Sequence, residues 1–248
     1  MDHIVREGYG GTGPGAITPD GCAVELYRRT GARGEPEIVA RAAGDRLPGA
    51  RLLELGSGAG RLTRPLSELG FAVTAVDESA EMLAAVRERL TGSVRTVRSP
   101  IETLELDGAP DFDVVLLASF LVHAGTEGVR EGLLRTCRRY VADDGCVVIQ
   151  REPSALHGEL PYERELPDGG LVRIVASEPS AVGRPGARTL RCEYHFPDAK
   201  WTQTYLSCPL TEEEFEGSLT EAGLELDRYL DEGRTWARAV PDARARAR

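Results

Sequence analysis

The sequence predicts an α/β protein built on a doubly wound, largely parallel sheet. Three observations support this class. An apolar run at residues 52–55 leads into the glycine-rich turn GSGAG at residues 56–60, as expected of a buried strand that ends in a tight turn. A helical pattern then covers residues 61–68. A second apolar run, residues 71–76, ends at the acid Asp77. Strand, glycine turn, helix, strand and acid in this order form half of a doubly wound nucleotide site.

The residue types in this stretch predict specific roles. Gly56 can take the positive φ that the turn needs, Gly58 lets the backbone approach a ligand, and Gly60 lets the helix begin close to the sheet. Asp77 can accept two hydrogen bonds from a ribose diol. Glu54 ends the first strand, where its carboxylate could pair with a ligand's ammonium group.

The spacing of the glycines restricts the class of ligand. It is G-x-G-x-G rather than the dinucleotide pattern G-x-G-x-x-G, and no Lys-Ser or Lys-Thr follows it as in a phosphate-binding P-loop. Two carboxylates and a single arginine, Arg61, suit a ligand without phosphates, whose own carboxylate Arg61 could bind.

These residues resemble a known family. ELGSGAG at 54–60 and the acid of AVDES are similar to motif I and the post-I acid of the class I S-adenosylmethionine-dependent methyltransferases, and the resemblance covers about residues 38–148. It implies a Rossmann-like seven-stranded sheet, mostly parallel with an antiparallel C-terminal strand, and S-adenosylmethionine as cofactor. The candidate cofactor contacts are Tyr27, Glu54, Gly56, Ser57, Gly58, Gly60, Arg61, Asp77, Glu78, Met82, Pro100, Ile101, Glu102, Ser119 and Phe120.

Residues 1–34 are predicted to be an N-terminal arm. The first 21 residues are rich in Gly and Pro and could be a disordered tail or an arm that orders over the active site. Residues 22–30 look helical, and Tyr27 is either the family's cofactor-contacting tyrosine or a packing residue. Residues 35–152 are the predicted cofactor-binding core, opening with a helix at 35–46 that has Pro36 in its first turn.

Residues in the second half of the core are the expected contacts of the adenine. Ser79 is the expected N-cap of a helix at 80–90, in which Met82 could contact adenine or belong to the core. After a short strand at 94–97, Pro100 stands where the family usually carries an acid that binds adenine. Recognition would then depend on backbone and apolar groups near Ile101, or on Glu102.

A strand at 111–119 follows, with Ser119, Phe120 and His123 at its carboxyl end, where ligands of open α/β sheets bind. A helix at 133–140 and a turn plus fifth strand at 141–150 complete this part of the core. Arg151 and Glu152, at the tip of the fifth strand, could bind a charged acceptor or simply form a surface pair.

Residues 153–209 break the alternation of strands and helices. The segments 171–176, 189–196 and 201–206 are β-type, and we predict a β-rich insertion that covers the site on the acceptor side. Residues 210–240 should return to the core, with a helix capped by Thr211 and Glu214 and two closing strands at 224–230 and 235–240. Residues 241–248 are a predicted disordered tail.

The candidate catalytic bases are histidines. His123 follows the fourth strand, whereas His157 and His195 lie in the insertion and could reach an acceptor; each could instead be structural. Methyl transfer to an amine needs little more than positioning and a route for the proton, while a hydroxyl usually needs a base or a metal. No metal-ligand pattern is visible, so no metal is predicted.

The composition excludes some classes of binding partner and of catalytic residue. A net charge of −10 argues against nucleic acid. Lys200 is the only lysine, which nearly excludes a catalytic lysine, and the preference for arginine is typical of GC-rich bacterial genomes. Five scattered cysteines, no visible signal pattern and no apolar run long enough to span a bilayer predict a cytoplasmic protein without membrane contact, a monomer or homodimer.

Together these features predict a methyltransferase that acts on a small molecule of secondary metabolism, at nitrogen, oxygen or carbon. Two alternatives stay open. The chain could bind the cofactor and catalyse a cyclisation or elimination, or it could be a non-catalytic sensor or partner subunit.

Overall fold

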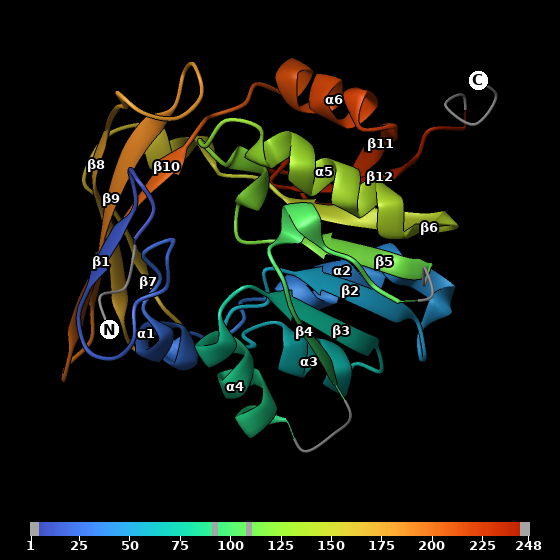
Figure 1. The fold of residues 1–248 in the computed structure, drawn as a ribbon, viewed down its shortest axis with the longest axis horizontal. Helices are drawn as coiled ribbons and strands as arrows, with labels where there is room; N and C mark the ends of the chain where they lie inside the picture. The colour runs from blue at the N-terminus through green and yellow to red at the C-terminus, as the bar shows by residue number, and fades with distance from the viewer. Residues whose placement is uncertain (1–4, 91–93, 108–110, 244–248) are drawn as a thin grey trace.

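The computed structural model describes residues 5–90, 94–107 and 111–243. It contains two sheets (Figure 1). A seven-stranded sheet has helices on both faces, and a five-stranded sheet stands beside the carboxyl ends of its parallel strands. This arrangement confirms the predicted α/β fold with a β-rich insertion.

The larger sheet has the strand order β11-β12-β6-β5-β2-β3-β4. Its neighbours from β4 to β6 are parallel, whereas β12 is antiparallel to both β6 and β11. The predicted antiparallel strand near the C-terminus is therefore present. In chain order the strands are β2 (Arg51–Leu55), β3 (Ala72–Asp77), β4 (Arg95–Arg98), β5 (Phe112–Leu117), β6 (Val141–Gln150), β11 (Leu224–Tyr229) and β12 (Trp236–Pro241).

Alternate residues of the strands serve the two faces of this sheet, as the two-residue period of a strand requires. Leu53 and Leu55 pack in one hydrophobic cluster with residues of α5 and α6, and Leu52 packs in a second cluster with residues of α2 and α3. The helices are α1 (Val24–Arg29), α2 (Glu35–Ala43), α3 (Thr63–Glu68), α4 (Ala80–Arg89), α5 (Val129–Tyr140) and α6 (Glu212–Glu221).

Both predicted helix caps are formed. The Ser79 hydroxyl accepts the Met82 amide at 3.1 Å. Thr211 accepts the Glu214 amide at 3.2 Å, while the Glu214 carboxylate accepts the Thr211 amide at 2.8 Å. This reciprocal pair is a capping box, and it starts α6 where the sequence predicts.

The smaller sheet is antiparallel, in the order β1-β10-β9-β8-β7. The three predicted strands of the insertion are present, and the sequence did not reveal β7 or β1. The N-terminal arm supplies β1, which pairs Gly10 with Thr204 of β10. The strands are β1 (Gly10–Thr12), β7 (Tyr162–Glu165), β8 (Leu171–Pro179), β9 (Arg188–His195) and β10 (Lys200–Ser207).

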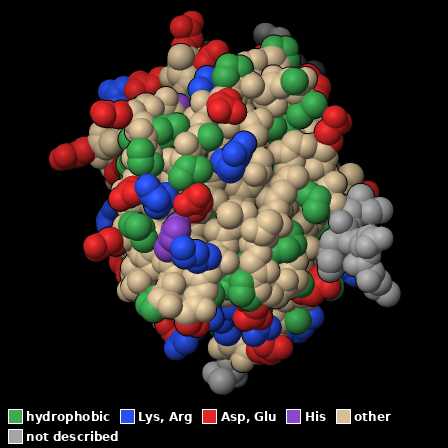
Figure 2. Space-filling model, turned by 90° about the vertical axis from the view of Figure 1, so that its left-hand side faces the viewer, with side chains coloured by type: hydrophobic (Ala, Val, Ile, Leu, Met, Phe, Trp, Pro, Cys, Tyr) green, Lys and Arg blue, Asp and Glu red, His purple; other side chains and the backbone are tan. Residues whose placement is uncertain are grey.

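The two faces of the smaller sheet differ in polarity. Ile174 and Leu190 belong to a buried cluster on the inner face. Arg173 forms ion pairs across the strands, at 2.6 Å with Glu163 and 3.8 Å with Glu193. Figure 2, which views the molecule from the side of this sheet, shows acidic and basic side chains next to one another rather than one large patch of either sign.

The helix α3 ends at Glu68, as predicted, and Leu69, which caps it, is 40% exposed. One detail differs from the sequence predictions. Gly60 does not serve close packing on the sheet. A Cβ there would lie 3.2 Å from Val86 of α4, so the close approach is between the turn and that helix. Residues 244–248 of the predicted tail lie outside the described residues.

Candidate active site

The glycine turn lies between β2 and α3, at the carboxyl edge of the sheet. Gly56, Gly58 and Gly60 have φ of +72°, +54° and +84°, a region that favours glycine. The amides of Gly56 and Ser57 both donate to the Val76 carbonyl at 2.9 Å, which fixes the turn against β3. A Cβ on Gly56 would meet Leu121 at 2.7 Å. A side chain at position 56 would therefore collide with Leu121.

Two acids end the strands on either side of this turn. Asp77 accepts the Gly58 amide at 2.8 Å through Oδ2 and the Ser79 amide at 2.9 Å through Oδ1. Glu54 is 3% exposed and accepts the Thr63 hydroxyl at 2.6 Å. Burial raises the pKa of Asp77 to about 6 and that of Glu54 to about 7. Both carboxyls thus change charge near neutral pH.

The remaining residues near the turn have partners within the protein. The Arg61 guanidinium forms an ion pair with Glu35, in which the two side chains are 19% and 11% exposed. Tyr27 lies over the turn, since its ring is 3.8 Å from where a Cβ of Gly58 would be. Its hydroxyl donates to Gln203 of β10 at 3.3 Å. The hydroxyl oxygen of Ser57 is buried and has no hydrogen-bond partner among the described residues.

A cavity of about 500 Å³ opens at the carboxyl ends of β3 and β4. Residues 17–19 of the N-terminal arm form one wall, and Glu78, Ser79 and residues 98–100 form the other. Glu78 also pairs with Arg6 of the arm at 2.5 Å. Glu78, a predicted cofactor contact, and Pro100, which stands at the predicted adenine position, therefore line one cavity next to Asp77.

The other predicted adenine contacts lie at its edge or away from it. Ile101 is close to the glycine turn, with its Cδ1 3.6 Å from where a Gly56 Cβ would stand. Glu102 lies against α5, because a Cβ on Gly132 would meet its side chain at 2.8 Å. Met82 is 3% exposed and packs with Val24 and Ala59, as a core residue does.

The chain after β5 leads from the sheet to the insertion. Ser119 and Phe120 both have left-handed backbones, with φ of 55° and 64°, which is rare for residues other than glycine. The Ser119 amide donates to the Gln150 side chain at 2.8 Å. The Phe120 side chain packs into the cluster of the smaller sheet that contains Leu156 and Tyr205. This turn therefore joins the two sheets at the predicted acceptor side.

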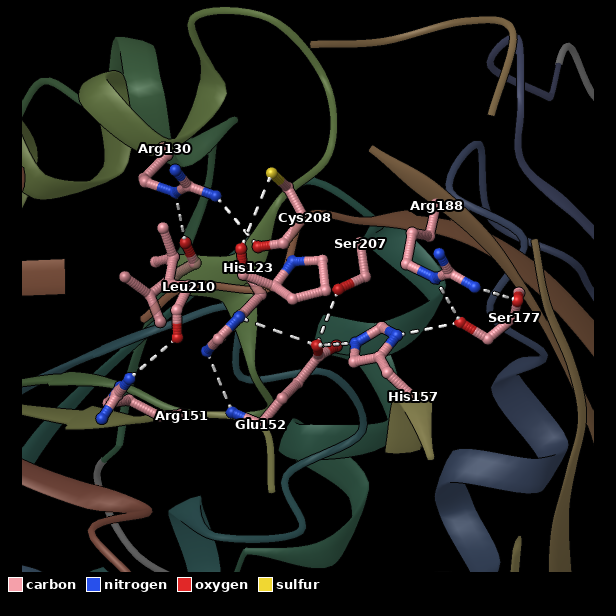
Figure 3. Close-up of polar contacts among 12 residues, drawn as sticks. His123, Arg130, Arg151, Glu152, His157, Ser177, Arg188, Ser207, Cys208 and Leu210 are labelled. Carbon is pink, nitrogen blue, oxygen red and sulfur yellow. Dashed lines mark hydrogen bonds and ion pairs between the residues drawn. The ribbon is translucent and has the colours of Figure 1, made fainter. Parts of the chain in front are cut away.

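Glu152, two residues beyond the end of β6, is the centre of a buried polar cluster (Figure 3). Its side chain is 2% exposed, and its Oε2 accepts the Ser207 hydroxyl at 2.7 Å and lies 2.9 Å from His157 Nε2. His157 Nδ1 lies 2.9 Å from the Ser177 hydroxyl, which accepts Arg188 Nε at 2.8 Å. The structure thus brings one predicted histidine into contact with a carboxylate.

His123 occupies the opposite side of the same carboxylate. It is 3% exposed, and its Nε2 accepts the Glu152 amide at 3.0 Å. Its Nδ1 lies 3.6 Å from Glu152 Oε2. Burial lowers the pKa of His123 to about 4, so the imidazole is neutral at physiological pH. With Nε2 already engaged by an amide, this histidine has no lone pair available to act as a base.

His195 lies apart from this cluster. It ends β9 and pairs with Glu193 at 3.0 Å, with its side chain 30% exposed. The sequence did not single out Glu152 as the shared partner of two histidines, although its place at the tip of β6 was a usable signal. Ser177 and Ser207, in β8 and β10, carried no such signal, because only the fold brings them to Glu152.

In the described part of the chain, no three His, Cys, Asp or Glu side chains gather as metal ligands. Each helix of that part is too short or too polar to cross a lipid bilayer.

The part of the chain that contains the glycine turn is similar to a known protein family. Residues 53–147, which include the glycine turn, Asp77 and β5, match the family model described as "Methyltransferase domain". This segment is a methyltransferase domain. The resemblance to class I S-adenosylmethionine-dependent methyltransferases is thereby confirmed.

Curated relatives of the methyltransferase domain are O-methyltransferases of ubiquinone biosynthesis. The protein of Caulobacter sp. (strain K31) is 38% identical over 104 residues, which are 41% of this chain and 40% of that protein. The protein of Xanthomonas campestris pv. campestris (strain B100) is 31% identical over 125 residues, 48% of this chain and 49% of the relative. The match thus spans two fifths to one half of these relatives.

Solved structures resemble the chain over most of its length. A sugar N-methyltransferase from Streptoalloteichus sp. ATCC 53650 has a TM-score of 0.66 at 21% identity, covering 93% of this chain and 98% of that one. An amino pentose methyltransferase from Micromonospora echinaspora has a TM-score of 0.65 at 21% identity, covering 88% and 95%. At these identities the likeness establishes the fold, here including the region beyond the methyltransferase domain.

Proposed function

We propose that this protein transfers a methyl group from S-adenosylmethionine to a small molecule held between the methyltransferase domain and the smaller sheet. The observation that carries the proposal is the fit of the glycine turn to that cofactor. The turn holds Gly56 and Gly58 in backbone conformations that favour glycine. Beside it lie a buried Ser57 hydroxyl, which has no partner among the described residues, and the Asp77 carboxylate at the next strand end.

Different protein groups would bind the ribose, the ammonium group and the adenine of the cofactor. Each oxygen of Asp77 already accepts one amide and keeps a second lone pair, so the carboxylate can accept both ribose hydroxyls. Glu54 would hold the methionine ammonium group. The cavity lined by Glu78 and Pro100 would take the adenine.

Some residues that the sequence predicted as cofactor contacts have another role in this proposal. We assign Met82 to the core and Glu102 to packing against α5, since their side chains lie away from the cavity. Arg61 would reach the cofactor's carboxylate only by sharing its guanidinium with Glu35. Tyr27, lying over Gly58, would cover the methionine portion.

The acceptor site lies where Phe120 meets the smaller sheet. When bound, S-adenosylmethionine supplies an electrophilic methyl group on its sulfonium. The protein excludes water with the aromatic cluster around Phe120 and Tyr205 and offers the Glu152 carboxylate, paired with His157, to hold the acceptor's proton. His123 positions Glu152 rather than acting as the base, and His195 takes no part.

We infer the class of acceptor from solved structures with the same fold and from the curated relatives. The solved structures with the same fold include a sugar N-methyltransferase and an amino pentose methyltransferase, and the curated relatives are O-methyltransferases. These precedents support a small molecule of secondary metabolism as acceptor. The ordered N-terminal arm, which walls the adenine cavity, would serve as the lid in a cytoplasmic enzyme.

Calorimetry with S-adenosylmethionine and S-adenosylhomocysteine tests the cofactor assignment. Gly58→Val and Asp77→Ala should each abolish measurable binding. Gly169→Val is the matched control, because Gly169 also has positive φ (+79°) but borders open space in the β7–β8 turn. Asp198→Ala, at an exposed aspartate paired with Arg29, is the control for loss of charge. Unchanged tight binding by both site variants would refute the proposal.

Product mass then tests the reaction. Methyl transfer adds one CH₂ to the acceptor, whereas a cyclisation assisted by the cofactor's charge adds nothing. A protein that binds the cofactor and yields neither change with an extract of small metabolites would be the sensor alternative.

A further inference from the structure

Among the described residues, the cluster around Glu152 leaves one buried donor without a partner. His123 Nε2 accepts the Glu152 amide at 3.0 Å, so the proton of the neutral imidazole is on Nδ1. No described residue accepts that proton, because Glu152 Oε2 is 3.6 Å away, beyond hydrogen-bond range. A buried N–H without an acceptor is rare in folded proteins and needs an explanation.

The same cluster leaves an acceptor open beside it. Ser207 and His157 both contact Glu152 Oε2, which uses the two lone-pair positions of that oxygen. Within the described part of the chain, no hydrogen bond reaches Oε1, although the side chain is only 2% exposed. Half of the hydrogen-bonding capacity of this carboxylate is therefore unused within the described part of the chain.

The outer partners hold the carboxylate in this state. The Ser177 oxygen accepts a hydrogen bond from Arg188 Nε, so the Ser177 hydroxyl can donate its own hydrogen bond to His157 Nδ1. His157 then carries its proton on Nε2 and donates it to Glu152. The hydrogen bonds from Arg188 Nε through Ser177 and His157 to Glu152 Oε2 are thus matched donor to acceptor. Within the described residues, His123 Nδ1–H and Glu152 Oε1 remain without a hydrogen bond in this cluster.

The chemistry of the missing ligand follows from these two groups. A ligand that contacts both groups must donate a hydrogen bond to the carboxylate and accept one from the imidazole. A hydroxyl group does both, as does a water molecule, which the hydroxyl of a ligand would replace. An aliphatic amine is an ammonium at neutral pH and only donates, an ether only accepts, and a carboxylate would be repelled by Glu152.

We infer that His123 and Glu152 form a subsite that recognises a hydroxyl group of the acceptor. Figure 3 shows the two imidazoles on opposite sides of the Glu152 carboxylate. The inference rests on the proposed function and adds to it, because it requires an acceptor that carries a hydroxyl, whichever of its atoms receives the methyl group.

Nuclear magnetic resonance of the histidine side chains tests the subsite without turnover. The protein is saturated with S-adenosylhomocysteine, and three matched probes are added at millimolar concentration: cyclohexanol, cyclohexylamine and methoxycyclohexane. Cyclohexanol, which donates and accepts, should shift the ¹⁵N signals of both His123 and His157, with His123 remaining the Nδ1–H tautomer. Equal or larger shifts with either other probe, or no shift with cyclohexanol, would overturn the inference.

Variants locate the effect. Glu152→Gln keeps the shape of the side chain but offers an amide N–H₂ where a hydroxyl needs an acceptor, so the cyclohexanol response should fall at least tenfold. Glu193→Gln is the matched control at the other His–Glu pair, which is partly exposed, and should leave the response unchanged. Calorimetry with S-adenosylhomocysteine separates the two proposals. If the unmodified protein binds S-adenosylhomocysteine but shows no response to cyclohexanol, the subsite alone is refuted. If the unmodified protein does not bind S-adenosylhomocysteine, the proposed function is refuted.

Discussion

The affinity for S-adenosylhomocysteine should fall steeply between pH 7 and pH 5, because both acids assigned to the cofactor must be ionised to bind it. Burial raises the pKa of Asp77 to about 6 and that of Glu54 to about 7. From pH 7 to pH 5 the ionised fraction of Asp77 falls about tenfold and that of Glu54 about fiftyfold. The dissociation constant should therefore rise roughly 500-fold over this range.

The assay is calorimetric titration at half-unit steps of pH. At pH 7, repeating the titration in buffers of different ionisation enthalpy should reveal release of about half a proton, almost all of it from Glu54. Glu54→Gln should remove that release and the upper part of the pH dependence. An affinity that changes less than threefold between pH 5 and pH 8 would refute the assignment of both acids.

Stability separates this effect from acid unfolding. Because both pKa values are higher in the folded than in the unfolded protein, the folded form binds more protons between about pH 4 and pH 7. The contribution of these two acids to the free energy of unfolding is thus largest below about pH 4 and is lost as pH rises through their folded pKa values. Their effects on binding and on stability have opposite signs, and thermal unfolding measured alongside the titration distinguishes them.

Three further predictions concern stability, measured by chemical denaturation and thermal melting. Thr211→Ala should remove the capping box of α6 and cost about 1 kcal/mol, which lowers the Tm by about 2–4 °C; an unchanged Tm would contradict the role of the cap. Arg151→Met should cost about 2 kcal/mol, since the guanidinium donates to the Leu210 carbonyl at 3.1 Å and its loss leaves acceptors unpaired; a more stable variant would show that burying the charge outweighs those bonds. Leu66→Ala should cost about 2–5 kcal/mol at a fully buried site, whereas Leu69→Gln should change the free energy of unfolding by no more than about 0.5 kcal/mol; similar costs for both would contradict the end of α3 at Glu68.

The sequence predicted those parts of the fold that local chemistry determines. The buried strands, the glycine turn and the caps at Ser79 and Thr211 each depend on residues close together in the chain. The strand β1 escaped notice because it is the three-residue segment GGT, which carries no apolar signal. It exists only because β10, about 190 residues later, offers an edge for pairing.

In the candidate site, too, the sequence predicted the residues of a local motif and missed those that only the fold brings together. The cofactor side could be predicted because Gly56, Gly58 and Asp77 have to stand in a short motif. The acceptor side could not, because Glu152 meets His157 and Ser207 through the insertion. Its histidines were visible as residue types, but which of them keeps a usable nitrogen depends on backbone hydrogen bonds that no sequence pattern records.

The turn after β5 explains how the acceptor side is held together. Left-handed backbone at Ser119 and Phe120 is unfavourable by about 1–2 kcal/mol for each residue, so contacts elsewhere must hold it. The Gln150 side chain accepts the Ser119 amide, and the Phe120 ring is packed into the smaller sheet. The chain direction that results places His123 beside the amide of Glu152 at the tip of β6.

The insertion then secures His123 from its other side. The Cys208 amide, just after β10, donates to the His123 carbonyl at 2.7 Å. Arg130, which is 3% exposed, donates to the carbonyls of both Val122 and Cys208, at 2.8 and 3.1 Å. A strained turn from the methyltransferase domain and a strand end from the insertion therefore meet at one buried guanidinium. Since His123 lies between them, its unpaired Nδ1–H is held by groups that leave it little freedom to find a partner within the protein, as a preformed site for a ligand requires.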